Sequence, residues 1–152
     1  MRALLQRVSR AEVRVDGGVI AQIDLGLVVL LGVGQDDDDP TADALARRIV
    51  ELRIFRDDAG KTNRSILEVG GGILVVSQFT LYADTSRGRR PGFTDAAPAE
   101  LGERLYLRVA DGLAAAGVAP VVTGRFGAEM AVELVNDGPF TLWLDSPRRT
   151  PA

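Results

Sequence analysis

Two short stretches of the chain combine hydroxyl, amide and backbone groups in patterns that could support chemistry. They are Ser77-Gln78-Phe79-Thr80-Leu81 and Asn136-Asp137-Gly138-Pro139-Phe140-Thr141. The 152 residues include no histidine and no cysteine. Chemistry that needs an imidazole, a thiolate or a Cys/His metal site is therefore excluded. What remains must use hydroxyls, carboxylates, backbone groups and the substrate itself.

The first stretch follows an apolar run, Ile73-Leu74-Val75-Val76, which predicts a buried strand. Where such a strand emerges, a rigid scaffold can offer backbone and side-chain hydrogen bonds to a ligand. From spacing alone, the simpler interpretation is that Ser77 and Thr80 satisfy local backbone groups. As a nucleophile, either would need a base. Asp84 is near in sequence, but a carboxylate alone is a poor base for an unactivated alcohol.

The second stretch is predicted to contain a turn at Gly138-Pro139, between two strands. Composition alone does not imply a cis peptide bond there. A Gly-Pro pair has two carbonyl oxygens and only one N–H group. A tight turn could therefore aim its carbonyls at a small cation, such as the ammonium group of a ligand.

Composition predicts one compact domain, because 46% of the residues are apolar and few are aromatic. The net charge of −3 argues against a protein that coats nucleic acid, although not against one that grips a single end. The acidic run Asp36–Asp39 is predicted to precede a helix, with a metal site as the less favoured alternative. The basic run Arg87, Arg89 and Arg90 is interpreted as a solvated loop.

No apolar run approaches the ~20 residues of a membrane-spanning helix, and the first residues lack the features of a signal peptide. A cytoplasmic protein without a membrane partner is expected. Gly70-Gly71-Gly72 lacks the lysine of a phosphate-binding loop, so these glycines predict a turn.

Hydrophobic periodicity predicts eight strands, at residues 4–8, 11–15, 19–23, 25–33, 73–79, 118–123, 129–135 and 140–144. Two main helices are predicted to begin near Pro40 and Pro98. This order predicts an α+β fold in a single domain, with helices packed on a mostly antiparallel sheet or partly closed barrel. The domain would span residues 1–146, followed by a flexible C-terminal tail at 147–152.

The two stretches together resemble the paired signatures of the D-aminoacyl-tRNA deacylase family, also called D-tyrosyl-tRNA deacylase. The family phrases SQFTL and NxGPxT are both intact and in the right order, and the resemblance extends from Met1 to about Asp145. One departure is Thr62-Asn63-Arg64-Ser65-Ile66, where relatives often read Met-Asn-Leu-Ser-Leu.

The resemblance implies an enzyme that hydrolyses the ester joining a D-amino acid to the terminal adenosine of tRNA, and also glycyl-tRNA mischarged on tRNA-Ala. It implies a homodimer with two sites at the interface. No cofactor and no metal ligand are expected among the residues of the chain. The catalytic pocket would receive the terminal adenosine and the ester of the acceptor end, and would be lined by Ser77, Gln78, Phe79 and Thr80.

The resemblance also implies a chiral filter contributed by the opposite subunit. Gly138 and Pro139, joined by a cis bond, would present both carbonyls to the substrate ammonium group. Asn136 and Thr141 would brace the dipeptide, and Arg7 would help to hold it. With the ammonium group and the ester held, rigid backbone on one side of the α-carbon would leave room for a hydrogen atom but not for a side chain. Such a site would reject L-amino acids and accept glycine.

Two mechanisms are compatible with these residues. Thr80 could attack the ester as a covalent nucleophile. Alternatively, the 2′-hydroxyl of the terminal ribose could help to activate water while N–H groups near Phe79 and Thr80 stabilise the oxyanion. The second is favoured because the chain has no imidazole.

Two other classes of function are weighed against this one. A non-catalytic nucleic-acid adaptor or dimerisation domain would not need a chirality filter, and no basic stripe supports a duplex binder. An editing domain of a tRNA synthetase is a third interpretation, but the Gly-Pro phrase favours a free-standing deacylase.

Overall fold

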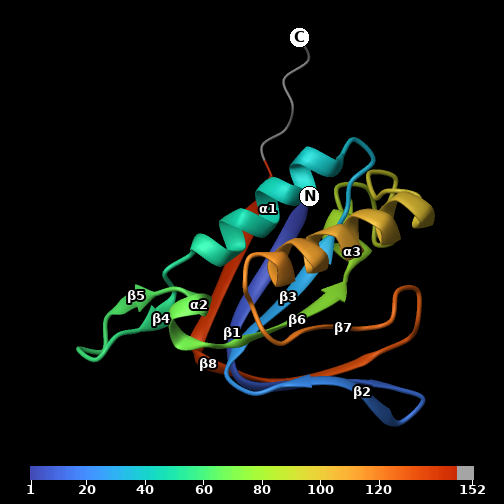
Figure 1. Ribbon diagram of the computed structural model, residues 1–152. Coiled ribbons are helices and arrows are strands. Elements are labelled where there is room, and N and C mark those ends of the chain that lie inside the picture. Colours follow the sequence, from blue (N-terminus) through green and yellow to red (C-terminus); the bar gives the residue numbers. More distant parts are fainter. Residues whose placement is uncertain (147–152) are drawn as a thin grey trace.

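The computed structural model describes residues 1–146, and the predicted flexible tail at 147–152 lies outside the described residues. A six-stranded mixed sheet curves into a nearly closed barrel, and helices cover one of its faces (Figure 1). The predicted α+β single-domain fold is confirmed.

The long first strand organises the sheet. β1 (Arg2–Val15) pairs antiparallel with β2 (Gly18–Ile23), β3 (Gly26–Gly32) and β8 (Ala131–Asp145). On the other side of β3, the pairings to β6 (Gly72–Ser77) and from there to β7 (Val121–Thr123) are parallel. Crossovers that contain helices separate these parallel strands along the chain, as parallel pairing requires.

Several predicted strand boundaries were wrong. The strands predicted at 4–8 and 11–15 form the continuous β1, and those predicted at 129–135 and 140–144 form the continuous β8. β1 and β8 pair with each other along almost their whole lengths, so neither strand is interrupted by a turn. The strand predicted at 73–79 ends at Ser77, and a 3₁₀ helix, η1 (Phe79–Tyr82), follows. The strand predicted at 118–123 begins only at Val121.

The two main helices are α1 (Asp39–Glu51) and α3 (Ala99–Ala115). The prediction for the acidic run is confirmed, because the Asp38 side chain caps α1 by accepting from the Thr41 N–H at 3.0 Å. A third helix, α2 (Ile66–Val69), was not predicted. It has a capping box between Ser65 and Glu68 and ends at Gly70 in the left-handed conformation.

The core has two layers separated by the sheet. On the helical side, Leu27, Val29 and Leu31 of β3 pack in a cluster with residues of α1 and α3. On the other side, Val28 packs with residues of β1, β2 and β6. β3 is therefore buried on both faces, as predicted. Its first residue requires glycine, because a Cβ at Gly26 would lie 1.8 Å from the Gly72 carbonyl oxygen.

A small hairpin beside the main sheet was also not predicted as strands. β4 (Phe55–Arg56) and β5 (Thr62–Arg64) pair across the turn that was predicted at 57–60, where the Gly60 N–H donates to the Asp57 carbonyl at 2.9 Å. Among residues 1–146, no helix is long and apolar enough to cross a membrane.

Candidate active site

The stretch Ser77–Leu81 leaves the sheet at the end of a fully buried strand. The last tie to the sheet is the Gln78 N–H, which donates to the Leu31 carbonyl at 2.8 Å. The chain then turns into η1, in which Phe79 and Thr80 are exposed and Leu81 and Tyr82 are half-buried. Phe79 is 58% exposed, and its ring meets that of Phe93 edge-on, with centroids 5.0 Å apart. The Gln78 amide donates to the Thr80 hydroxyl.

The start of η1 offers two free backbone donors. Its first turn has no side-chain cap, and the N–H groups of Phe79 and Thr80 have no protein acceptor within residues 1–146. Backbone N–H groups at the start of a helical turn lack an internal partner. They are fixed in direction by the buried strand that precedes them, so they can stabilise negative charge that develops on a bound oxygen.

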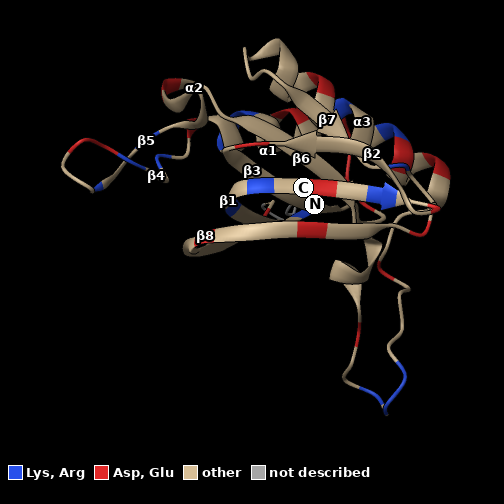
Figure 2. Cartoon of the chain, turned by 90° about the horizontal axis from the view of Figure 1, so that it is seen from below, with Lys and Arg blue, Asp and Glu red and all other residues tan. Residues whose placement is uncertain are grey.

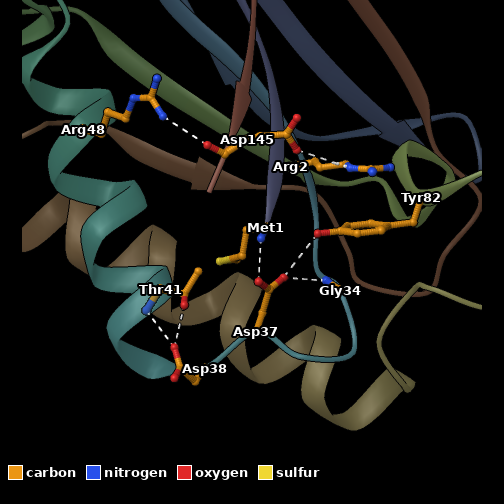
Figure 3. A network of polar contacts seen from close by, with 9 residues as sticks. All are labelled: Met1, Arg2, Gly34, Asp37, Asp38, Thr41, Arg48, Tyr82 and Asp145. Carbon is orange, nitrogen blue, oxygen red and sulfur yellow. Dashed lines mark hydrogen bonds and ion pairs between the residues drawn. The ribbon is translucent and has the colours of Figure 1, made fainter. Parts of the chain in front are cut away.

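Polar contacts beneath η1 hold it against the sheet (Figure 3). The Tyr82 hydroxyl lies 3.4 Å from Asp37, which also accepts from the Gly34 N–H at 2.6 Å. The Arg2 guanidinium lies over the Tyr82 ring and donates to the Leu81 carbonyl at 2.8 Å. Burial, together with the Asp37 carboxylate, raises the pKa of Tyr82. Tyr82 is therefore protonated at neutral pH and supports η1 without being a base.

The second stretch is a bulge within β8 and not a turn between two strands, so that prediction was wrong. Asn136 pairs with Val8 and Thr141 pairs with Gln6, which leaves Asp137–Phe140 opposite the single residue Arg7. The extra residues bow out of the ladder, as in other bulges. Gly138 and Pro139 are exposed, and the peptide bond between them is cis.

Side chains fix the backbone of this bulge. The Asn136 Oδ1 accepts from the Phe140 N–H, and its Nδ2 donates to the Thr141 hydroxyl, both at 2.9 Å. Gly138 has φ +135°, and an added Cβ would lie 2.9 Å from an Arg7 nitrogen. The bulge therefore has room for glycine alone at this position.

Arg7 is the buried cation behind the bulge. Only 4% exposed, it donates to the Asp137 carbonyl at 3.0 Å and to the Ile54 carbonyl at 2.7 Å. Its guanidinium lies 4.8 Å from the centre of the Phe140 ring. The Asp137 carboxylate is 3.5 Å away and compensates the buried charge. The role of Ile54 was not predicted, because a backbone carbonyl leaves no signal in sequence.

The two stretches lie apart within one chain. Across the sheet, Ser77 aligns with Leu31 and then Ala3, whereas the bulge faces Arg7. This separation is three strand spacings across and four residues along β1, which amounts to roughly 20 Å. The structure thus brings together Ser77, Gln78, Phe79 and Thr80, and separately brings together Arg7, Asn136, Gly138, Pro139 and Thr141.

Other candidate groups contribute no chemistry here. Hydrogen bonds from Ser86 lower the pKa of Asp84, which makes this carboxylate a still weaker base. Residues 1–146 contain no cluster of three or more potential metal ligands of the His, Cys, Asp or Glu type. A cavity of about 750 Å³ lies along α1 and includes none of the predicted site residues; Pro40, Thr41 and Arg48 are among those that line it.

Comparison with known proteins places this geometry in a family. A family model described as D-Tyr-tRNA(Tyr) deacylase matches residues 4–145. A D-aminoacyl-tRNA deacylase of Paracoccus denitrificans is 58% identical over 149 residues, which cover 98% of this chain and 99% of the relative. One of Dinoroseobacter shibae is 61% identical over 145 residues, with coverage of 95% and 99%.

A solved structure of a protein named c-Myc DNA Unwinding Element Binding Protein has a TM-score of 0.91 and 39% identity, and covers 97% of this chain and 99% of that chain. The fold and these matches define a class of hydrolases that act on aminoacyl-tRNA. The chain belongs to the D-Tyr-tRNA(Tyr) deacylase family, and the resemblance drawn from its two stretches is confirmed.

Proposed function

We propose that this protein hydrolyses the ester bond of D-aminoacyl-tRNA, releasing the D-amino acid and tRNA, and spares the L-aminoacyl ester. The proposal rests mainly on Gly138-Pro139, an exposed dipeptide with two carbonyls that Asn136 and Arg7 hold rigid. A rigid backbone surface suits recognition of an α-ammonium group, because carbonyl oxygens accept from it in fixed directions.

The site is completed by two copies of the chain in a homodimer. Ser77–Thr80 and Gly138-Pro139 are too far apart in one chain to touch the same aminoacyl group. β8 has one strand partner, β1, within residues 1–146, and exposes Val132, Val135 and Trp143. An edge strand with apolar side chains is suited to bury itself against a second copy. The bulge of one copy would then face η1 of the other.

The selectivity for D-amino acids follows from which groups of the substrate the site holds. Gly138-Pro139 would hold the ammonium group, and the N–H groups of η1 would hold the ester carbonyl. Only the side chain and the hydrogen on the α-carbon then remain to exchange places. An L side chain would meet backbone, which cannot give way, whereas a D side chain would point outward. Glycine has no side chain to refuse, so glycyl-tRNA, including that mischarged on tRNA-Ala, would also be cleaved.

The reaction is addition of water to the ester carbonyl, followed by loss of the tRNA 3′-oxygen. The substrate 2′-hydroxyl would help to activate the water, because the chain has no histidine and Asp84 is held at low pKa. The unpaired N–H groups of Phe79 and Thr80 would stabilise the oxyanion. Thr80 would orient the ester and would not form a covalent intermediate. No metal or cofactor takes part, and the reaction belongs to the cytoplasm.

A nucleic-acid-binding module without catalysis is the alternative, which the name of the 39%-identical structure suggests for its own protein. The net charge of −3 disfavours it. The free donors of η1 and the fixed dipeptide serve no evident purpose in such a module.

The test is deacylation of D-tyrosyl-tRNA against L-tyrosyl-tRNA by the wild type and by Pro139→Ala. We expect the wild type to cleave only the D ester. The variant should lose activity or selectivity, because it removes the fixed ring from the dipeptide. A matched control is Pro98→Ala, which changes a proline at the start of α3. Binding of tRNA without cleavage of either ester would overturn the proposal in favour of the binding module.

A further inference from the structure

A loop between η1 and α3 projects from the body of the molecule and carries a concentrated positive charge (Figure 2). Its base is a pair of hydrogen bonds between the backbones of Asp84 and Gly92, at 2.8 and 2.9 Å. The seven residues between them, 85–91, include three arginines, Arg87, Arg89 and Arg90, and no acidic residue. All seven are exposed.

These arginines differ from most of the arginines that the structure describes in having no partner. Within residues 1–146 they make no ion pair or side-chain hydrogen bond. Eight arginines elsewhere pair with carboxylates; they are Arg2, Arg7, Arg10, Arg14, Arg56, Arg64, Arg104 and Arg108. The acids flanking the loop, Asp84 and Asp95, lie at its base, and Asp84 already accepts from the Ser86 N–H. Three guanidinium groups without a carboxylate partner within four residues have the chemistry to bind anions.

The base of the loop is fixed and only the tip is free. The return arm is tied to the end of β3, since the Gln35 N–H donates to the Asp95 carbonyl at 3.1 Å and the Ala97 N–H donates to the Val33 carbonyl at 2.9 Å. At the tip, Gly88 has φ +75° and nothing within 4 Å of an added Cβ. The arginines are thus carried on an arm that starts from an ordered base.

The same arm carries half of the exposed aromatic pair. Phe93 follows Gly92 directly and packs edge-on against Phe79, which precedes Thr80. A surface that stacks bases on aromatic rings beside basic side chains is typical of single-stranded nucleic-acid binding. The loop that carries the arginines therefore adjoins the start of η1 through Phe93.

We propose that the loop at 85–91 binds the phosphates of the tRNA acceptor arm that precede the terminal adenosine. This inference rests on the proposed function, because it requires the terminal adenosine at η1. Gly88 is four residues after Asp84 in the chain, so the tip reaches up to about 14 Å from the base. The contacts recognise the backbone and not the sequence.

The decisive variant replaces all three arginines, Arg87→Gln, Arg89→Gln and Arg90→Gln. We expect the KM for D-tyrosyl-tRNA to rise at least about tenfold, with kcat unchanged, because the contacts act on binding alone. The slope of log KM against log salt concentration should fall by about two to three, because each lost phosphate contact lowers it by about one. Cleavage of D-tyrosyl-adenosine, which has no phosphate, should equal that of the wild type.

A matched control is the pair Arg47→Gln and Arg125→Gln, set against Arg89→Gln and Arg90→Gln. Both double variants change the net charge equally, and all four side chains are exposed. Only the loop variant should change KM and the salt slope. If it does not, the loop inference is overturned while the proposed function stands. If the wild type cleaves neither substrate, the proposed function fails and this inference with it.

Discussion

Two exposed regions of this protein are built in opposite ways. At Ser77–Leu81 a buried strand fixes the backbone, and the side chains of Phe79 and Thr80 are exposed on its surface. At Asn136–Thr141 the backbone itself is the exposed surface, and buried or half-buried side chains fix it from behind. The first region resembles a platform for a flexible ligand, and the second resembles a rigid wall.

The difference identifies which changes each region tolerates. In the first region the Gln78 N–H is bonded to the sheet backbone and the Leu81 carbonyl to the Arg2 side chain. The outward side chains of Phe79 and Thr80 do not hold the backbone, so they can change without moving it. In the second region, the Asn136 and Arg7 side chains make the hydrogen bonds that set the backbone. Replacing one of these side chains moves the carbonyls that would meet the substrate, and small displacements of a positioning group are costly.

Arg7→Ala should break the rigid region most severely. It would leave the buried Ile54 carbonyl without its donor, at a cost of about 1–3 kcal/mol, and would also remove the donor to the half-buried Asp137 carbonyl. We expect the free energy of unfolding to fall by about 2–5 kcal/mol and deacylation to fall at least about 100-fold. Urea unfolding and D-tyrosyl-tRNA cleavage measure the two effects.

Arg10→Ala is the control for Arg7, since its ion pair with Glu133 is exposed and should contribute about 0–1 kcal/mol. Equal destabilisation by the two variants would contradict the role given to Arg7. If Arg7→Ala does not fold, Arg7→Lys keeps the charge and loses the forked geometry, and it should still lose activity.

Asn136→Ala should have the next largest effect, and mainly on selectivity. It removes the acceptor for the Phe140 N–H, so the bulge gains freedom at the position that faces the substrate. We expect the D-to-L ratio of kcat/KM to fall about tenfold to 100-fold. Thr141→Val removes only the partner of the Asn136 amide nitrogen and should lower the ratio less. An unchanged ratio in Asn136→Ala would show that the wall does not depend on this side chain.

Thr80→Ala should lower kcat only slightly, which would distinguish the first region from the rigid backbone of the second. The hydroxyl accepts from the Gln78 side chain and is not needed by the backbone. We expect kcat to fall less than about tenfold, whereas loss of a nucleophile would lower it by several orders of magnitude. Single-turnover cleavage of D-tyrosyl-tRNA by Thr80→Ala and Thr80→Ser measures this. Complete loss of turnover with normal tRNA binding would support the covalent mechanism.

Acid should have the smallest effect, a decrease in the free energy of unfolding that comes from the turn held by the Asp57 carboxylate. Hydrogen bonds to Asp57, chiefly from the Lys61 N–H, lower its pKa in the folded protein. The stabilisation is therefore present above the unfolded pKa and is lost as the pH falls below about 4. Unfolding free energies between pH 6 and pH 3 should fall less steeply in Asp57→Asn than in the wild type. Parallel curves would contradict this assignment.

Hydrophobic patterns predicted most of the fold. β3 is buried on both faces because it contains almost only apolar residues, and α1 begins after an acidic cap, and both features are local. η1 was missed because the end of β6 on the sheet defines it. The hairpin β4–β5 was missed because strands of two and three residues are too short to show an alternating pattern. α2 was missed although its Ser65 and Glu68 are a visible capping signal. The continuity of β8 depends on pairing with β1, more than 100 residues away in sequence.

The site was predictable only in part, for a related reason. Residue types at the two stretches indicated hydroxyl and backbone chemistry, but their separation of roughly 20 Å follows from sheet register. The support of the bulge by Arg7 and Ile54 also depends on register. The free N–H groups of Phe79 and Thr80 occur because β6 ends just before them. Residue propensities did not predict where that strand ends.

The central claim is that each site joins Ser77–Thr80 of one copy to Gly138-Pro139 of another. Co-expression of Phe79→Asp with Arg7→Lys, each with a different tag, yields purified mixed dimers. In such a dimer one site has both defects and the other has neither. We expect about half of the wild-type D-tyrosyl-tRNA cleavage per dimer, by the two-fold symmetry of a dimer with two sites, although each variant alone has lost activity. A mixed dimer no more active than its parents would contradict the claim, because a site within one chain always retains one defect.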